Sequence, residues 1–180
     1  DTPRLPFIPE SFRSLANSNL DIPVLSDAII PSPLLTLRII RESGIRPGAS
    51  VLIIGKGAGY LGAAAAALTE RVTVAELSEE LYRTYPDIYA GLDINPVTLV
   101  NSLAGAAESA FMYDIVIVHG GTPVLGQEIS SFLRPSGVLI VPITGKSGYQ
   151  NLLRIQYGSG LTVTSLGETF FPVLDELAPD

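Results

Sequence analysis

The stretch Val51-Leu52-Ile53-Ile54-Gly55-Lys56-Gly57-Ala58-Gly59 decides the fold. Its first four residues form a short, unbroken apolar run, typical of a strand that is covered on both faces in a parallel sheet. A glycine-rich loop follows, and the alanine-rich segment Tyr60 to Leu68 is expected to form a helix. Residues Arg71 to Glu76 then predict a second strand that ends on a carboxylate. This order predicts a βαβ unit and therefore an α/β fold.

The rest of the chain extends this unit into a doubly wound, mostly parallel sheet with helices on both faces. We expect further strands at Val97 to Val100, Ile115 to Val118 and Val138 to Val141, and helices at Leu34 to Ile40, Ser78 to Tyr85 and Gly126 to Leu133. Two alternating segments, Leu152 to Tyr157 and Leu161 to Leu166, are separated by Gly158-Ser159-Gly160 and predict an antiparallel C-terminal edge. Residues 1–33 contain six prolines and are expected to form an irregular arm over the core.

Composition narrows the class of protein. The 180 residues are 47% hydrophobic, which favours a single domain over 1–180 with a full core. The net charge of -7 and the scattered basic residues argue against a nucleic-acid partner. Cysteine is absent and His119 is the single histidine, so no metal site is expected. The longest apolar segment is too short to cross a bilayer, and no signal-peptide pattern follows Asp1, so we expect a cytoplasmic location and no membrane partner.

The glycine loop is a candidate nucleotide-binding site. Gly55, Gly57 and Gly59 follow a strand, so their backbone should lie at the carboxyl edge of the sheet, where ligands bind in open α/β folds. Glu76 ends the next strand, 21 residues after Gly55, where a carboxylate can accept both hydroxyls of a ribose. The purely structural alternatives are a tight turn that needs glycine and a glutamate that caps a helix beginning near Ser78.

A second interpretation of the same loop is a nicotinamide site. Gly57, Gly59 and Gly62 match the spacing of the dinucleotide fingerprint, which indicates an NAD-dependent oxidoreductase. The chain offers no Tyr-x-x-x-Lys or His/Asp set that would carry out hydride-transfer chemistry.

Several segments, in order along the chain, resemble the protein-L-isoaspartate O-methyltransferase family. They are Thr2-Pro3-Arg4, Phe7-Ile8-Pro9-Glu10, Arg46-Pro47-Gly48 through Tyr60, Val72 to Glu76, Tyr113-Asp114, Leu133 to Gly137, Val141-Pro142 and Phe171 to Leu174. The resemblance implies a class I methyltransferase that uses S-adenosylmethionine to methylate a carboxylate of a protein or peptide. It also implies a set of cofactor contacts: Gly55, Gly57, Gly59, Tyr60, Glu76 and Ser102.

The chain departs from the family in the substrate loop. Where the family reads P-I-G-x-G-Q-T-I-S-x-P, residues 23–33 lack both glycines, and Ile29 and Pro31 replace the hydroxyl residues. Ser32 is adjacent but out of register, and the family's G-D-G corresponds to Asn101-Ser102-Leu103. Isoaspartyl methylation is therefore expected to be slow, because a poorly oriented acceptor reacts slowly. A non-catalytic relative of that family, which binds S-adenosylmethionine or serves as an interaction module, is the alternative.

Two residues are candidates for a catalytic role. Ser32 lies next to the family's serine position, and His119 follows a predicted strand, so it should lie at the carboxyl edge of the sheet. His119 could act as a base or contact the substrate, but a histidine bonded to the backbone is the alternative because no carboxylate partner is close to it in sequence.

Overall fold

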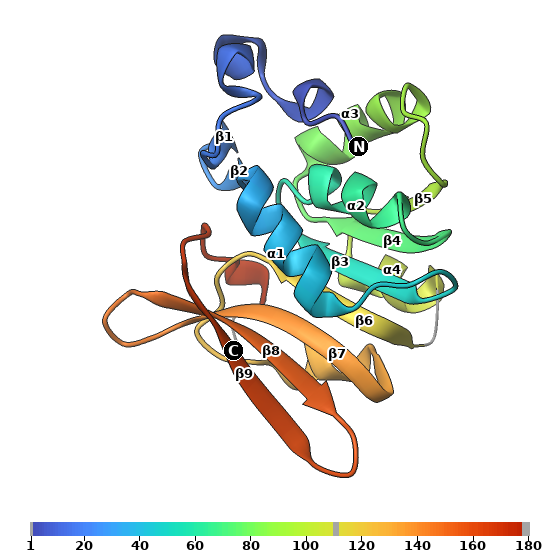
Figure 1. Ribbon diagram of the computed structural model, residues 1–180, viewed down its shortest axis with the longest axis vertical. Helices are drawn as coiled ribbons and strands as arrows, with labels where there is room; N and C mark the ends of the chain where they lie inside the picture. Colours follow the sequence, from blue (N-terminus) through green and yellow to red (C-terminus); the bar gives the residue numbers. More distant parts are fainter. Residues whose placement is uncertain (1, 110–111, 178–180) are drawn as a thin grey trace.

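The computed structural model describes residues 2–109 and 112–177, which form a seven-stranded sheet, a separate two-stranded hairpin and helices on both faces of the sheet (Figure 1). The order of strands in the sheet is β5-β4-β3-β6-β7-β8-β9. The parallel part comprises β3 (Ser50–Gly55), β4 (Arg71–Glu76), β5 (Val97–Val100), β6 (Tyr113–His119) and β7 (Leu133–Thr144). The antiparallel edge comprises β8 (Gln150–Tyr157) and β9 (Leu161–Thr169).

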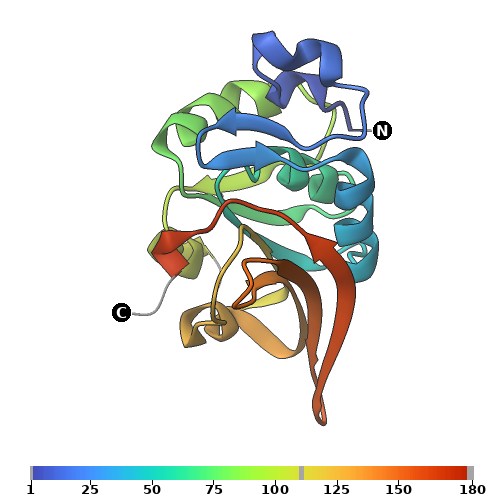
Figure 2. The same ribbon diagram turned by 90° about the vertical axis from the view of Figure 1, so that its left-hand side faces the viewer.

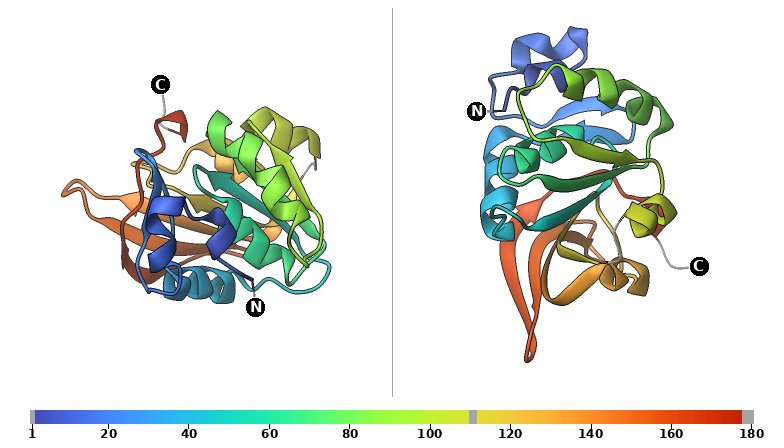
Figure 3. Two further views of the ribbon diagram at one scale, coloured as in Figure 1. Left: turned by 90° about the horizontal axis from the view of Figure 1, so that it is seen from above. Right: turned by 90° about the vertical axis from the view of Figure 1, so that its right-hand side faces the viewer.

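Helices cover the two faces because successive residues of the central strand point to opposite sides. Val51 and Ile53 pack with residues of α1 (Pro33–Ser43) and α2 (Gly59–Ala66). Leu52 and Ile54 pack with residues of α4 (Leu103–Ser109) and α5 (Gln127–Ser131). The remaining α-helix of the described residues, α3 (Glu79–Ala90), follows β4 (Figure 3). The doubly wound sheet with an antiparallel C-terminal edge is thus confirmed.

The N-terminal arm is more regular than the sequence indicated. It contains the short 3₁₀ helices η1 (Leu5–Phe7) and η2 (Glu10–Leu15), followed by an antiparallel hairpin of β1 (Ile22–Leu25) and β2 (Ala28–Ile30). The arm expected to be irregular thus contains short regular elements, because Ile22 and Ile30, both fully buried, anchor the hairpin against α2 and α3. The buried Arg4 guanidinium also donates to the carbonyls of Leu20, at 2.7 Å, and Ile30, at 3.1 Å.

Two further differences concern the second half of the chain. The helix expected to reach Leu133 ends at Ser131, and Leu133 already pairs with Tyr113 as the first residue of β7. Helix α4 was not predicted, because Leu103–Ser109 is short and lacks a clear apolar period. The other expected strands are present, each within a few residues of the expected bounds.

The hairpin and the C-terminal segment lie on the same side of the molecule. In Figure 2 both face the viewer, with the hairpin above the segment that leads into η3 (Asp175–Leu177). Backbone hydrogen bonds join Gly121, just after β6, to Pro172 and Leu174, so this segment crosses the carboxyl edge of the sheet. The candidate site therefore lies beneath two separate parts of the chain.

Candidate functional site

The ends of three neighbouring strands bring the candidate residues together. Gly55 is the register partner of Glu76 on β4 and of His119 on β6. The backbones approach so closely that a Cβ at Gly55 would overlap the carbonyl group of His119. Only glycine allows this approach of the two backbones. The position of Gly55, where the loop begins, is therefore fixed between β4 and β6.

Glu76 binds the glycine loop directly. Its Oε2 accepts hydrogen bonds from the amides of Gly57 and Ala58, both at 3.0 Å, and its Oε1 accepts one from Ser78 at 3.0 Å. The residue is fully buried, and this desolvation raises the pKa of its carboxyl group to about 7, although the three backbone donors oppose the shift. Glu76 thus holds the two loop amides that precede α2, and it also bonds at the start of α3, as a capping residue would.

The hairpin covers the loop. A Cβ at Gly57, whose φ is +81°, would lie 2.5 Å from the carbonyl oxygen of Ile29. The same carbonyl accepts a hydrogen bond from Nε2 of His119, at 2.9 Å. The backbone of Ile29 therefore lies against the middle of the glycine loop, and Gly55, Gly57 and Gly59 are all buried.

Aromatic rings surround the end of the loop. A Cβ at Gly59 would lie 2.5 Å from the ring of Tyr85, and the hydroxyl of Tyr89 donates to the carbonyl of Gly59 at 3.0 Å. Tyr60 is 8% exposed, and its ring lies 5.8 Å from that of Phe7, which also contacts Tyr85 and Tyr89. Tyr85 and Tyr89 therefore have a packing role, and Tyr60 belongs to the same cluster.

His119 is buried and bonded to the backbone of the hairpin. It is 2% exposed, its ring lies 5.1 Å from that of Phe171, and Nδ1 has no hydrogen-bond partner among the described residues. Burial lowers the pKa of its imidazole to about 4, which outweighs the bond to Ile29 and the distant charge of Asp21. The ring is therefore neutral at pH 7 and donates from Nε2 to the hairpin.

The two candidate serines cap helices. The Oγ of Ser32 accepts from the amide of Leu35 at 3.4 Å, so Ser32 is the N-cap of α1. The Oγ of Ser102 accepts from the amide of Gly105 at 3.1 Å, at the start of α4. Both hydroxyls are engaged with the backbone.

Lys56 is a residue of the site that sequence reasoning did not select. Its Nζ lies 2.7 Å from Oδ2 of Asp27, in the turn of the hairpin, and 2.7 Å from Oε1 of Glu176, in η3. The hydrogen bonds to Asp27 and Glu176 raise the pKa of the ammonium, and the bond to Lys56 lowers the pKa of Asp27. Its position after Gly55 was the available signal, but its partners lie 29 and 120 residues away in sequence.

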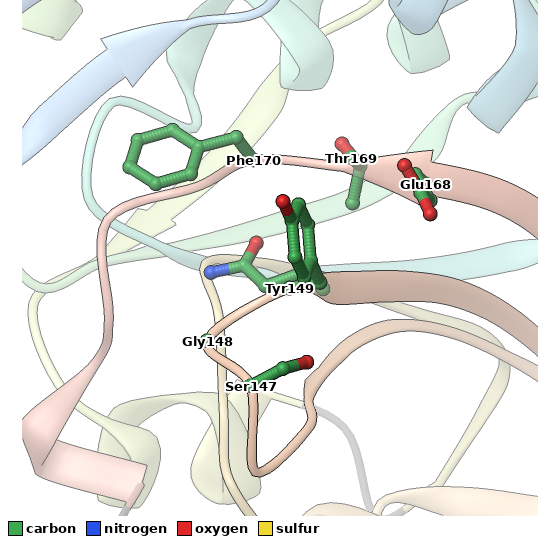
Figure 4. Close-up of a pocket in the computed structure, with 7 residues that line it drawn as sticks. Ser147, Gly148, Tyr149, Glu168, Thr169 and Phe170 are labelled. Carbon is green, nitrogen blue, oxygen red and sulfur yellow. The ribbon is translucent and has the colours of Figure 1, made fainter.

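A cavity of about 500 Å³ opens at the same edge of the sheet, over β8 and β9 (Figure 4). The exposed rings of Tyr149 and Phe170 are on its rim. The cavity is lined by Ser147, Gly148, Tyr149, Gln150, Glu168, Thr169 and Phe170. None of these residues belongs to the glycine loop or is Glu76, so this cavity is separate from the candidate nucleotide site.

Within residues 2–109 and 112–177, no group of three or more His, Cys, Asp or Glu residues is arranged to hold a metal ion. The helices of the same part of the chain are all too short or too polar to cross a membrane.

Comparison with known proteins identifies the family. Residues 1–176 match the family model described as protein-L-isoaspartate(D-aspartate) O-methyltransferase (PCMT). A protein-L-isoaspartate O-methyltransferase of Brucella anthropi is 30% identical over 153 residues, which cover 83% of this chain and 69% of that protein. A protein-L-isoaspartate O-methyltransferase of Ignicoccus hospitalis is 27% identical over 180 residues, which cover 97% of this chain and 85% of that protein.

Solved structures show the same fold. A structure from Plasmodium falciparum, described as a protein-L-isoaspartate O-methyltransferase in complex with S-adenosyl-L-homocysteine, has a TM-score of 0.78 at 19% identity. The similarity covers 96% of this chain and 86% of that one. The family match spans almost the whole sequence, and the strand order places the glycine loop and Glu76 at one edge. This chain belongs to the protein-L-isoaspartate O-methyltransferase family of S-adenosylmethionine-dependent methyltransferases.

Proposed function

We propose that this chain binds S-adenosylmethionine at the glycine loop and transfers its methyl group to a carboxylate of a protein or peptide. The observation that carries the proposal is the meeting of Glu76 with the amides of Gly57 and Ala58 at the carboxyl edge of the sheet. A carboxylate at the end of the second strand, beside a glycine-rich loop that follows the first, is the arrangement by which α/β folds recognise a ribose. The family match supports the same chemistry.

The residues fit the cofactor in kind and in position, but the space beside them is filled by the chain itself. Gly55, Gly57, Gly59, Tyr60 and Glu76 are all buried. The backbone of Ile29 and the ring of Tyr85 lie against the loop. The proposal therefore requires a second conformation, in which the hairpin moves away from Gly57.

Within that open conformation, the loop glycines and Glu76 would hold the cofactor, with Tyr60 and Ser102 as further contacts. The cofactor supplies a methyl group that is already activated by its sulfonium leaving group. The task left to the protein is to align the acceptor oxygen with that methyl carbon and to exclude water.

The acceptor side is depleted of polar groups. Ile29 and Pro31 offer no side-chain hydrogen bond to a carboxylate, Ser32 caps α1, and the neutral His119 donates to the hairpin. We therefore propose that methylation of isoaspartyl peptides is weak.

One specific observation favours a second candidate function. The filled space beside the glycine loop, together with the missing hydroxyls, suits a relative that keeps the fold for interaction and no longer transfers methyl groups. The first candidate binds S-adenosylmethionine, whereas an interaction module that has lost the cofactor site does not.

Thermal unfolding with added ligands tests the proposal. S-adenosylmethionine or S-adenosylhomocysteine is expected to raise the melting temperature, because a ligand that binds only the folded state stabilises it by mass action. NAD and NADP serve as controls for the dinucleotide interpretation and are expected to have no effect. A rise in melting temperature with NAD alone would contradict the proposal and favour the oxidoreductase interpretation. An unchanged melting temperature at millimolar S-adenosylhomocysteine would favour the interaction module.

A further inference from the structure

Lys56 joins three parts of the chain that the sequence keeps far apart. It lies in the glycine loop itself, and its ammonium contacts Asp27 in the hairpin turn and Glu176 in η3. The Lys56 side chain is 15% exposed, whereas those of Asp27 and Glu176 are 51% and 42% exposed. The ammonium is therefore the more buried partner, and both carboxylates reach it from the solvent side.

Lys56 holds the turn of the hairpin, which precedes the strand residue Ile29 that lies against Gly57. The strands of the hairpin are anchored at Ile22 and Ile30, which are fully buried. Between them, Ser26 and Asp27 are exposed. The hairpin is thus attached to the site by two polar contacts: the ion pair of Asp27, in the turn, with Lys56, and the hydrogen bond of the Ile29 carbonyl, in β2, with His119.

The second segment that Lys56 holds is anchored to the residues that follow β6. Leu174 packs against Gly120, and its amide donates to the carbonyl of Gly121. Glu176 follows two residues later and reaches back to Lys56. One ammonium therefore links the hairpin turn and the C-terminal segment at the glycine loop.

We propose that Lys56 is an autoinhibitory latch: its ion pairs with Asp27 and Glu176 hold the hairpin turn and the C-terminal segment closed over the glycine loop, and S-adenosylmethionine enters when these pairs break. For its ligand, this inference rests on the function proposed above. The latch itself is a property of the protein without ligand and can be measured separately.

The latch lowers the apparent affinity by reducing the fraction of molecules that can bind, since the measured dissociation constant is the intrinsic one divided by that fraction. Exposed ion pairs are weak singly, but here two carboxylates share one partly buried ammonium. Loss of the latch is expected to tighten binding on the order of tenfold, which corresponds to ~1.4 kcal/mol.

Hydrogen exchange measured by mass spectrometry tests the latch without a ligand. In Lys56→Gln, exchange is expected to rise in both segment 22–30 and segment 170–177. Asp27→Asn should raise it only in 22–30, and Glu176→Gln only in 170–177. The matched control is Arg83→Gln, which removes an exposed ion pair with Glu79 on the surface of α3 and should change neither segment. Unchanged exchange in all three variants would overturn the latch.

Calorimetric titration with S-adenosylhomocysteine tests the consequence for binding. Lys56→Gln and Asp27→Asn should bind more tightly than the parent chain, and added salt should tighten binding to the parent by screening the ion pairs. Weaker binding by a folded Lys56→Gln would overturn the latch and make Lys56 a direct contact of the ligand. Faster exchange without binding in any variant would uphold closure by Lys56 but contradict the proposed cofactor and, with it, the gating of cofactor entry.

Discussion

The amide of Gly57 donates to both carboxylate oxygens of Glu76, at 3.2 Å to Oε1 and 3.0 Å to Oε2. The glycine loop is therefore held to β4 by a carboxylate that water does not reach. This relationship ties the shape of the candidate site to the ionisation of one buried group.

The first prediction concerns the pH dependence that Glu76 imposes. Its pKa is near 4.5 in the unfolded chain and about 7 in the folded one, so the folded state binds more protons between these values. Stability should therefore fall as pH rises from 4.5 to 7, by on the order of 3 kcal/mol from this group alone. In Glu76→Gln this contribution should vanish, which urea unfolding at a series of pH values would measure. Parallel curves for the variant and the parent would contradict the buried, protonated carboxyl.

His119 should produce the opposite slope. Its pKa falls from 6.5 to about 4 on folding, so the unfolded state binds more protons between these values and stability rises with pH. The contributions of His119 and Glu76 therefore largely cancel between pH 4.5 and 6.5 in the parent chain. Removing the imidazole in His119→Gln should expose a falling curve in this range, by the same unfolding measurement. If the slope of the variant does not become more negative than that of the parent, His119 is charged or exposed in solution.

Gly57→Ala should loosen the hairpin. The alanine must adopt φ near +81° and its Cβ would meet the Ile29 carbonyl at 2.5 Å, so we expect a loss on the order of 2–4 kcal/mol. Gly148→Ala is the matched control, because Gly148 has φ +83° with nothing within 4 Å of its added Cβ. The difference between the two free energies of unfolding isolates the contact with Ile29. Equal losses would place the hairpin away from the loop in solution.

Restoring hydroxyl groups in the substrate loop should increase isoaspartyl methylation. In the double variant Ile29→Thr and Pro31→Ser, the acceptor regains groups that can align its carboxylate, so transfer of labelled methyl should rise roughly ten- to a hundredfold. An aspartyl peptide of the same sequence serves as the control for non-specific transfer. Rapid methylation of the isoaspartyl peptide by the parent chain would show that Ile29 and Pro31 do not limit the reaction.

The central sheet could be predicted from the sequence because its signals are local. The run from Val51 to Ile54 is buried on both faces, and such a strand is continuously apolar. The hairpin could not be predicted in this way, because Pro23 and Asp27 suggest irregular chain, whereas packing of Ile22 and Ile30 against α2 and α3 decides the outcome. Tertiary packing overrode local preference there.

Part of the candidate site could likewise be predicted from local sequence signals, and part depends on contacts between distant residues. Gly55 and Glu76 were brought to one edge by the order of strands, which the sequence encodes at short range. The contact of Ile29 with Gly57 and the ion pairs of Lys56 join residues between 28 and 120 positions apart. No local pattern encodes such contacts, so the closed state of the loop emerged only from the structure.

The hydrogen bond between His119 and the carbonyl of Ile29 makes the imidazole a built-in spectroscopic reporter. It is the single histidine of the chain, so its ring gives one set of nuclear magnetic resonance signals that need no assignment among several. In the closed hairpin the ring is neutral, buried and protonated on Nε2, which fixes its nitrogen chemical shifts. Opening of the hairpin removes the Ile29 carbonyl from Nε2, so the nitrogen chemical shifts of this one ring are expected to change with the population of the open hairpin.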